Sequence, residues 1–254
     1  MKGKYNLVTL TPTISHLMHA ASGGADVLWD WEPLEIPLGT CVVKHLSGIV
    51  MGIDGGVGNG NTFKMYFAKP INGVAPPTIG TVHAVTTAAF TAACRPHVFA
   101  HMFCILTSID DGDAMIGYNV MGARSEDALE MGVMLQGDTV PYPGTTPGYQ
   151  TIFVAAQTSG AAIDFGTEVD LDNTSNVAAN MTGDSVQITT QGTDPQLVFA
   201  PGDLIQGHTG GPKMEVVSVD GTTTMTVKNI SAQIDDNEHL IHQNPMVINF
   251  GLEY

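Results

Sequence analysis

The segment from Cys94 to Cys104 holds the residue types in this chain that are best suited to chemistry. Its spacing is Cys-x2-His-x3-His-x2-Cys, with His97 and His101 between the two cysteines. Thiolate sulfur and imidazole nitrogen are ligands that zinc prefers in proteins. Four such residues in one short segment raise the hypothesis of a metal site, and with it that of a metal-dependent enzyme.

The geometry of either regular backbone argues against a single ion held by these four residues. On a helix, Cys94 and Cys104 would lie about 15 Å apart at a rise of about 1.5 Å per residue. Bonds of about 2 Å to one ion cannot reach both. On a strand, which the Val, Phe and Met content favours, His97 and His101 share a face about 13 Å apart, and Cys104 faces the other side. We therefore expect structural residues and assign no metal ligand.

The remaining close histidine pairs are His16 with His19 and His239 with His242. Each pair lies among polar residues, which predicts two pairs on the protein surface. Imidazole has an unperturbed pKa of about 6.5, so such groups can respond to pH in the physiological range. No feature of the sequence shows that these histidines do so.

Two acidic segments, Asp110–Asp113 and Asp170–Asn176, offer the hard oxygen ligands that calcium takes in proteins. Neither has the glycine at the sixth position and the glutamate at the twelfth that define an EF-hand loop. Asp and Asn are also common in turns, because their side chains bond to the nearby backbone. Calcium binding and plain turn formation are both open for these segments.

The sequence contains no motif for nucleophilic or phosphate chemistry. It has no Gly-x-Ser-x-Gly, no Gly-x4-Gly-Lys and no dinucleotide fingerprint, and the glycine-rich segment 55–60 predicts a hairpin tip. Trp29 and Trp31 lie two residues apart, so on a strand they would share a face and could stack on a sugar. We favour a place in the core or in a subunit interface for this pair. We expect no catalytic residue, no cofactor and no enzyme.

The elements around these residues are predicted to be β-strands. Charged residues make up 13% of the 254 residues, against a usual share of about 25%. So few Lys, Glu and Arg leave little material for exposed helices, and a Thr- and Val-rich chain with 29 glycines and 14 prolines favours an all-β fold. The hydrophobic share of 43% supports a substantial core.

The predicted strands divide the chain into two parts and a connection. Residues 1–156 hold seven or eight strand candidates and predict a β-sandwich or jelly-roll-like domain. The polar segment 157–185 predicts a linker or an exposed excursion. Residues 186–254 predict a small acidic β-barrel-like module, with a hairpin at Asp220-Gly221 and a last strand at 246–252.

Single elements can also be predicted in the first domain. The best helix signal is a short one at 125–134, where Ser125 and two acidic residues would begin the helix. Pro33 confines the strand around it to a sheet edge or a bulge. The strands are expected at 5–13, 29–37, 40–53, 62–68, 97–108, 115–121 and 151–156.

The formal charge of −16 at pH 7 is placed unevenly along the chain. Residues 1–124 hold 7 Lys or Arg and 8 Asp or Glu, whereas residues 125–254 hold 2 and 17. Nucleic acids and anionic membranes are bound by clustered cations. We therefore expect neither as a partner. The acidity favours solubility, or steering towards a basic partner or cations.

Cys41, Cys94 and Cys104 are an odd number of cysteines in a long chain, which is not a disulfide framework. Each lies in an apolar run, so we expect three buried thiols. The basic first residues are followed by no apolar segment of signal-peptide length. No stretch approaches about 18 uninterrupted apolar residues, so no transmembrane helix is predicted.

Several segments resemble uncharacterised virion proteins of marine tailed bacteriophages, namely Trp29–Pro37, Gly52–Gly56 and Tyr66–Lys69. The segments Phe199–Ile205 and Val217–Thr223 are similar to small β-modules of phage head-decoration and tail proteins. The resemblance lies in turn and strand patterns and carries over no site residue. It implies a structural role on a particle, in many copies.

We expect a virion structural protein, a capsid decoration or cement protein that stabilises the phage head shell through non-covalent contacts. The resemblance implies the major capsid protein or other virion proteins as partners, a homo-oligomer (a trimer), and a place in the virion after assembly in the host cytoplasm. The alternative is a tail-fibre or receptor-binding protein that touches a host glycan through Trp29 and Trp31 or through loop tips. A metal-dependent enzyme at Cys94–Cys104 is the third hypothesis.

Overall fold

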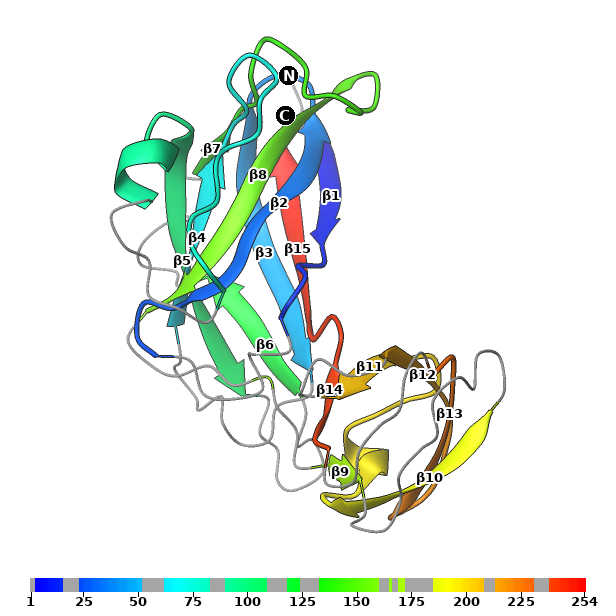
Figure 1. The fold of residues 1–254 in the computed structure, drawn as a ribbon. Helices are drawn as coiled ribbons and strands as arrows, with labels where there is room; N and C mark the ends of the chain where they lie inside the picture. The colour runs from blue at the N-terminus through cyan, green and yellow to red at the C-terminus, as the bar shows by residue number, and fades with distance from the viewer. Residues whose placement is uncertain are drawn as a thin grey trace.

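The structure is a computed structural model, and it describes residues 3–15, 23–51, 62–82, 90–108, 118–123, 133–159, 165, 169–171, 185–207, 213–230 and 238–254. Strands dominate these residues, beside a π-helix η2 (Phe90–Cys94) and a 3-10 helix η3 (Pro195–Leu197). The fold is all-β, which confirms the prediction from composition. Figure 1 shows a large sheet with a smaller barrel at its lower end.

The larger sheet has nine strands, each antiparallel to its partners. β1 and β2 form its two edges, which confirms that the strand with Pro33 lies at an edge. The sheet order is β1 (Tyr5–Leu10), β15 (Met246–Glu253), β3 (Cys41–Met51), β6 (Tyr118–Ala123), β5 (Val98–Ser108), β4 (Thr62–Ala68), β8 (Tyr149–Thr158) and β2 (Val27–Pro37), with β7 (Val133–Leu135) also paired to β3.

This sheet folds over itself into two layers around one core. Phe67 in β4 and Phe250 in β15 lie four strands apart in the sheet order, yet their ring centroids are 6.1 Å apart. Figure 1 shows β2 and β8 crossing in front of β3 and β15. Both layers contribute to one hydrophobic cluster, so the arrangement is sandwich-like, as predicted.

The alternation of buried and partly exposed side chains along β4 explains how this core forms. Phe63, Met65 and Phe67 are fully buried, whereas Lys64 and Tyr66 between them are partly exposed. Successive side chains of a strand point to opposite faces, so one face of β4 enters the core and the other faces outward. The predicted range 62–68 for this strand is therefore confirmed.

The smaller sheet forms a nearly closed six-stranded barrel. A bridge between Asp170 and His239 joins its two ends, and the N–H of Leu171 donates to the carbonyl oxygen of Glu238 at 3.0 Å. Its interior is apolar, with Ile188, Met225 and Val227 among the buried residues. The strand order is β14 (Leu240–His242), β11 (Leu204–Gly207), β12 (Lys213–Gly221), β13 (Thr224–Lys228), β10 (Val186–Gly192) and β9 (Val169–Leu171).

Two strands belong to other sheets than the sequence predicted. β15 falls within the predicted module 186–254, but it pairs with β1 and β3 in the large sheet. Its alternate residues Met246, Ile248, Phe250 and Leu252 fill the large core. β9 falls within the predicted connection 157–185, but it is a barrel strand. The partners of β15 lie far away in the sequence, whereas β9 pairs with β10, the next strand along the chain.

Two local predictions differ from the structure in detail. The hairpin at Asp220-Gly221 is confirmed, but both residues are in β12 and the loop is Thr222-Thr223. A register shift next to Gly221 moves the turn along the chain. The predicted helix 125–134 ends in β7, which begins at Val133, and its earlier part lies outside the described residues.

Candidate functional site

The four Cys and His residues of the Cys94–Cys104 segment lie in different surroundings in the structure. Cys94 Sγ lies 2.9 Å from the carbonyl oxygen of Pro77, and Cys104 is buried in the large core. His97 Nδ1 lies 2.9 Å from the carbonyl oxygen of Lys69, while His101 is exposed. Within the described ranges, no three His, Cys, Asp or Glu side chains are placed to hold a metal ion.

The three cysteines are buried and free, which confirms the prediction of buried thiols. Burial raises the pKa of Cys104 far above the usual range of a thiol, and it also raises the pKa values of Cys41 and Cys94. A thiol with a raised pKa carries little thiolate at neutral pH. None of the three is therefore suited to act as a nucleophile.

Trp29 and Trp31 do not form a common surface. Trp29 is fully buried in the large core, and its Nε1–H donates to the carbonyl oxygen of Val154 at 3.2 Å. Trp31 packs in another cluster, and its Nε1–H donates to Pro77 at 2.8 Å. A β-bulge after Trp29 breaks the period of two on which the shared face depended. The core interpretation holds for Trp29, and the sugar platform is excluded.

Several candidate residues lie outside the described part of the chain. They are His16, His19, the glycine-rich segment 55–60, the acidic loop Asp110–Asp113 and residues 172–176. Calcium binding and plain turn formation therefore both stay open for the acidic residues that lie outside the described part.

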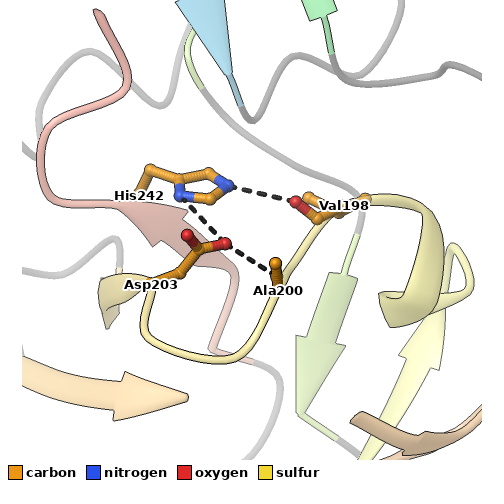
Figure 2. Close-up of polar contacts among 4 residues, drawn as sticks. All are labelled: Val198, Ala200, Asp203 and His242. Atoms are coloured by element: carbon orange, nitrogen blue, oxygen red, sulfur yellow. Dashed lines mark hydrogen bonds and ion pairs between the residues drawn. The ribbon is translucent and has the colours of Figure 1, made fainter. Parts of the chain in front are cut away.

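The best-defined polar cluster surrounds His242, in the barrel. Pro201 and Gly202 form a tight turn in which the N–H of Asp203 donates to Ala200 at 3.1 Å. Gly202 has a φ of +96°, as the third residue of a type II turn requires. The carboxylate of Asp203 turns back and accepts the N–H of Ala200 at 2.7 Å. This turn presents the carboxylate to His242 (Figure 2).

His242 is buried between two acceptors, and this corrects the prediction of a surface histidine. Its side chain is 3% exposed, Nε2 lies 3.2 Å from the carbonyl oxygen of Val198, and Nδ1 lies 3.9 Å from Asp203 Oδ2 (Figure 2). The ring also packs against Phe199 in a tilted arrangement, with 5.0 Å between the ring centroids. Burial lowers the pKa of His242, although the charge of Asp203 and the contact with Val198 oppose this effect.

The geometry at His242 favours a structural role. A neutral imidazole with its proton on Nε2 donates to Val198 and leaves the Nδ1 lone pair facing the carboxylate of Asp203. Protein groups face both ring nitrogens, so the ring cannot reach a substrate. The chemistry available here is a pH-dependent tie between β14 and the turn before β11. The apolar run Leu240-Ile241 before His242 was the sequence signal of its burial.

A second imidazole–carboxylate pair lies at the barrel seam. His239 Nδ1 is 2.5 Å from Asp170 Oδ1, and the two residues also form the backbone bridge that closes the barrel. The neighbouring Glu238 is buried and packs its side chain over Gly207. The side chain of His239 is 45% exposed, so within this pair the surface prediction holds for His239 and not for His242.

Asp220 organises the β12–β13 hairpin from the outside. Its carboxylate accepts the hydroxyls of Ser218 and Thr226, each at 2.7 Å, and the amide of Gln187 at 3.4 Å. The Ser218 and Thr226 bonds lower the pKa of Asp220, with a smaller part from Gln187, and burial opposes them. These three bonds anchor the Asp220 carboxylate on the outer side of the hairpin.

Comparisons with known proteins identify no relative. No family model matches the chain, and no curated protein matches it. Among the described residues, no helix has the length and hydropathy needed to span a membrane. The resemblance to virion proteins therefore stays an expectation from the sequence.

Proposed function

We propose that this chain is a virion structural protein, a capsid decoration or cement protein of a tailed bacteriophage. The proposal joins the sequence resemblance to an all-β fold in which the polar clusters serve turns, hairpins and seams. The observation that carries it is the open edge of the large sheet at β1, which among the described residues pairs with β15 alone. An open edge strand is a template for pairing with another chain.

The side chains of β1 suit such a contact. Tyr5 is 72% exposed and Leu7 is 64% exposed, on the same face of the strand. Large apolar side chains on an exposed sheet edge favour association, because their burial removes apolar area from water. Pairing of the β1 backbone would set the register, and Tyr5 and Leu7 would supply buried area.

Further exposed apolar residues lie in turns and strand ends of the large sheet. These residues are Leu38, Val74, Met134, Val140 and Tyr149. The N–H of Leu38 donates to Gly148 at 3.1 Å, which places the turn after β2 beside the start of β8. Contacts of this kind are weak singly, and a shell that presents many copies multiplies them through avidity.

In this proposal the large sheet docks on the major capsid protein or on another virion protein. The acidic barrel projects from the shell or clamps a neighbouring copy. Copies assemble as a homo-oligomer, and a trimer at threefold positions fits the symmetry of closed assemblies. The protein acts in the virion, after assembly in the host cytoplasm, without catalysis, nucleic acid or membrane.

A reconstitution experiment tests the assignment. Purified protein is added to phage particles that lack it, and binding is followed by co-sedimentation and by cryo-electron microscopy of the particles. We expect saturable binding to the head shell and a raised temperature of shell rupture. A map that places the protein in the tail alone would contradict the capsid assignment.

The receptor-binding alternative loses its main candidate site. Trp29 is fully buried, so a sugar cannot stack on both tryptophans. The alternative then depends on loop tips. A glycan array with the purified protein tests it directly, and clean binding to one sugar would favour it over decoration.

A further inference from the structure

The charges of this chain are segregated more sharply than its two halves suggest. Between Asp54 and Asp110 the sequence contains no acidic residue, although the chain has 25 of them. The same segment holds three of the nine Lys and Arg residues, namely Lys64, Lys69 and Arg95, together with three histidines. It forms β4 and β5, which are neighbours in the large sheet.

The outer face of β4 and β5 combines these cations with aromatic rings. Lys64 Nζ lies 5.1 Å from the ring centroid of Phe103, to which it is paired across the strands. The ring of His101 packs between Tyr66 at 6.4 Å and Phe103 at 5.9 Å. Phe99 is 37% exposed on the same strand. A cation over an aromatic ring is a common element of protein interfaces.

Lys69 and Arg95 extend this positive face at the start of β5. His97 joins them, because its Nδ1 contacts the carbonyl oxygen of Lys69 at 2.9 Å. Two acids approach the same region. Asp138 interacts electrostatically with Lys69, and Asp30 interacts electrostatically with Cys94. We call the outer side chains of β4 and β5, with Lys69, Arg95 and His97, the basic face.

The barrel supplies a surface of opposite charge. Residues 157–245 hold 12 Asp or Glu and only Lys213 and Lys228 as cations. On β12, Glu215 and Asp220 flank Val217, which is 39% exposed. Lys228 is already paired with Glu215 at 2.7 Å. The acidic barrel therefore presents carboxylates around an exposed apolar residue, as the basic face presents cations around aromatic rings.

The two surfaces lie too far apart to meet within one copy. Figure 1 shows β5 and the coiled segment η2 at the left of the molecule and the barrel at the lower right. We propose that the basic face of one copy binds the acidic barrel of a second copy of this chain. The inference rests on the proposed assembly role and specifies which surfaces make the contact between copies.

Such a contact is heterologous, since each copy uses two different surfaces. Heterologous contacts build rings when the rotation closes and filaments when it does not. A cyclic trimer is one such ring. Charge complementarity gives specificity and fast association, and it discourages two basic faces or two barrels from pairing.

Charge reversal on one or both surfaces tests the contact by sedimentation velocity of the purified full-length chain. The wild type should self-associate in a concentration-dependent manner that weakens with salt. Lys64→Glu with Arg95→Glu should weaken association about tenfold or more. Glu215→Lys with Asp220→Lys should do the same. The four changes in one chain restore opposite charges across the contact, so association should return.

Controls separate folding, assembly and function. Lys44→Glu reverses one positive charge on β3, away from both surfaces, and should leave association unchanged. Thermal unfolding of each variant shows whether it is folded. If the barrel reversal is unstable because Asp220 no longer accepts the hydroxyls of Ser218 and Thr226, the reversal on the basic face and the salt dependence of the wild type still test the contact. Association that is insensitive to all reversals, or a four-change variant that stays monomeric although folded, overturns the inference.

Two further outcomes distinguish this inference from the proposed function. A wild type that stays monomeric but binds shells contradicts the contact between copies and leaves the decoration role intact. Association that follows the reversal pattern without any shell binding contradicts the decoration role alone. A monomer whose basic face binds a short DNA duplex would show a different partner and overturn the inference.

Discussion

His239 Nδ1 lies 2.5 Å from Asp170 Oδ1, across the seam where the first and last strands of the barrel meet. Residues 69 positions apart in the chain thereby join the two ends of the nearly closed six-stranded barrel, and among the described residues they form a single bridge. The pair is partly exposed, with 45% and 22% of the two side chains open to solvent. A partly exposed ion pair adds little to the free energy of unfolding, so we expect the Asp170–His239 pair mainly to set which residues meet at the seam.

A double-mutant cycle should measure this pair. Asp170→Asn and His239→Gln, singly and together, should give a coupling energy of about 0.2–1 kcal/mol, as for exposed pairs. The measurement is urea unfolding with a probe of the barrel. The surface pair of Lys44 with Glu253, at 3.4 Å, is the matched control and should give a similar value. A coupling several times larger would mean that the seam pair also orders the strands around it.

The stability of the turn before β11 should depend on the glycine at position 202. Its φ of +96° is unfavourable for residues with a Cβ, and a Cβ here would meet no atom within 4 Å, so the cost is in the backbone alone. Gly202→Val should lower the free energy of unfolding by about 1–2 kcal/mol. Gly202→Asn should cost less, because Asn tolerates positive φ. Equal losses for the two variants would argue against a backbone cause.

His242 should make stability depend on pH. The fold lowers the pKa of this imidazole, chiefly through burial, so the unfolded chain binds the proton more readily. Stability is then greatest above the unfolded value of about 6.5 and falls as the pH drops from there towards the folded-state pKa. Urea unfolding at several pH values should show this loss in the wild type and a smaller one in His242→Gln.

A second variant tests whether the pH dependence of stability comes from His242. Asp203→Asn removes the charge that opposes the lowered pKa, while its side-chain oxygen can still accept the N–H of Ala200. The loss of stability should then continue to lower pH than in the wild type. A pH profile unaltered by either substitution would exclude His242 as its source.

Gln150 should be important for the loops at one end of the large sheet. This buried amide accepts the N–H of Gly137 at 2.8 Å and donates to the carbonyl oxygens of Pro37, at 2.9 Å, and Gly39. Gln150→Leu leaves these groups unpaired and should cost about 1–3 kcal/mol. The exposed Gln196→Leu should change stability by no more than about 0.5 kcal/mol. Thermal or urea unfolding compares the two variants.

The β1 edge should control binding to the shell. Leu7→Lys places a charge on the open edge strand, where lysine discourages pairing with another chain. We expect shell binding to weaken about tenfold, with little change in unfolding, because Leu7 is 64% exposed. Leu204→Lys on the barrel, where the leucine is 48% exposed, is the matched control and should bind normally. Equal binding by both variants would place the docking surface elsewhere.

Local patterns predicted much of this fold. The alternation of Phe63, Met65 and Phe67 predicted β4 to its observed bounds, because period-two burial is a property of the strand itself. The Asp220-Gly221 hairpin was found for a similar reason, with its loop displaced by a bulge. The same period of two wrongly predicted that Trp29 and Trp31 share a face, because the sequence of one strand does not show a bulge in its pairing with another strand.

The surroundings of His239 and His242 could not be predicted from local sequence patterns. His239 and His242 look alike in the sequence, both among polar neighbours, yet one is 45% exposed and the other 3%. Leu240 and Ile241 hinted at burial. The acceptors that enclose His242 come from residues 198–203, about forty positions earlier, and their approach depends on how β11 pairs with β14.

The amino-acid sequence by itself determined the all-β composition, the segregation of charge and the alternating strands, because these depend on residues within a few positions of one another. The tertiary structure decided that β15 joins the large sheet, that Asp170 and His239 close the barrel, and that His242 is buried. Each of these is a pairing between distant segments. Its free energy comes from the partner surface, so no local pattern carries it.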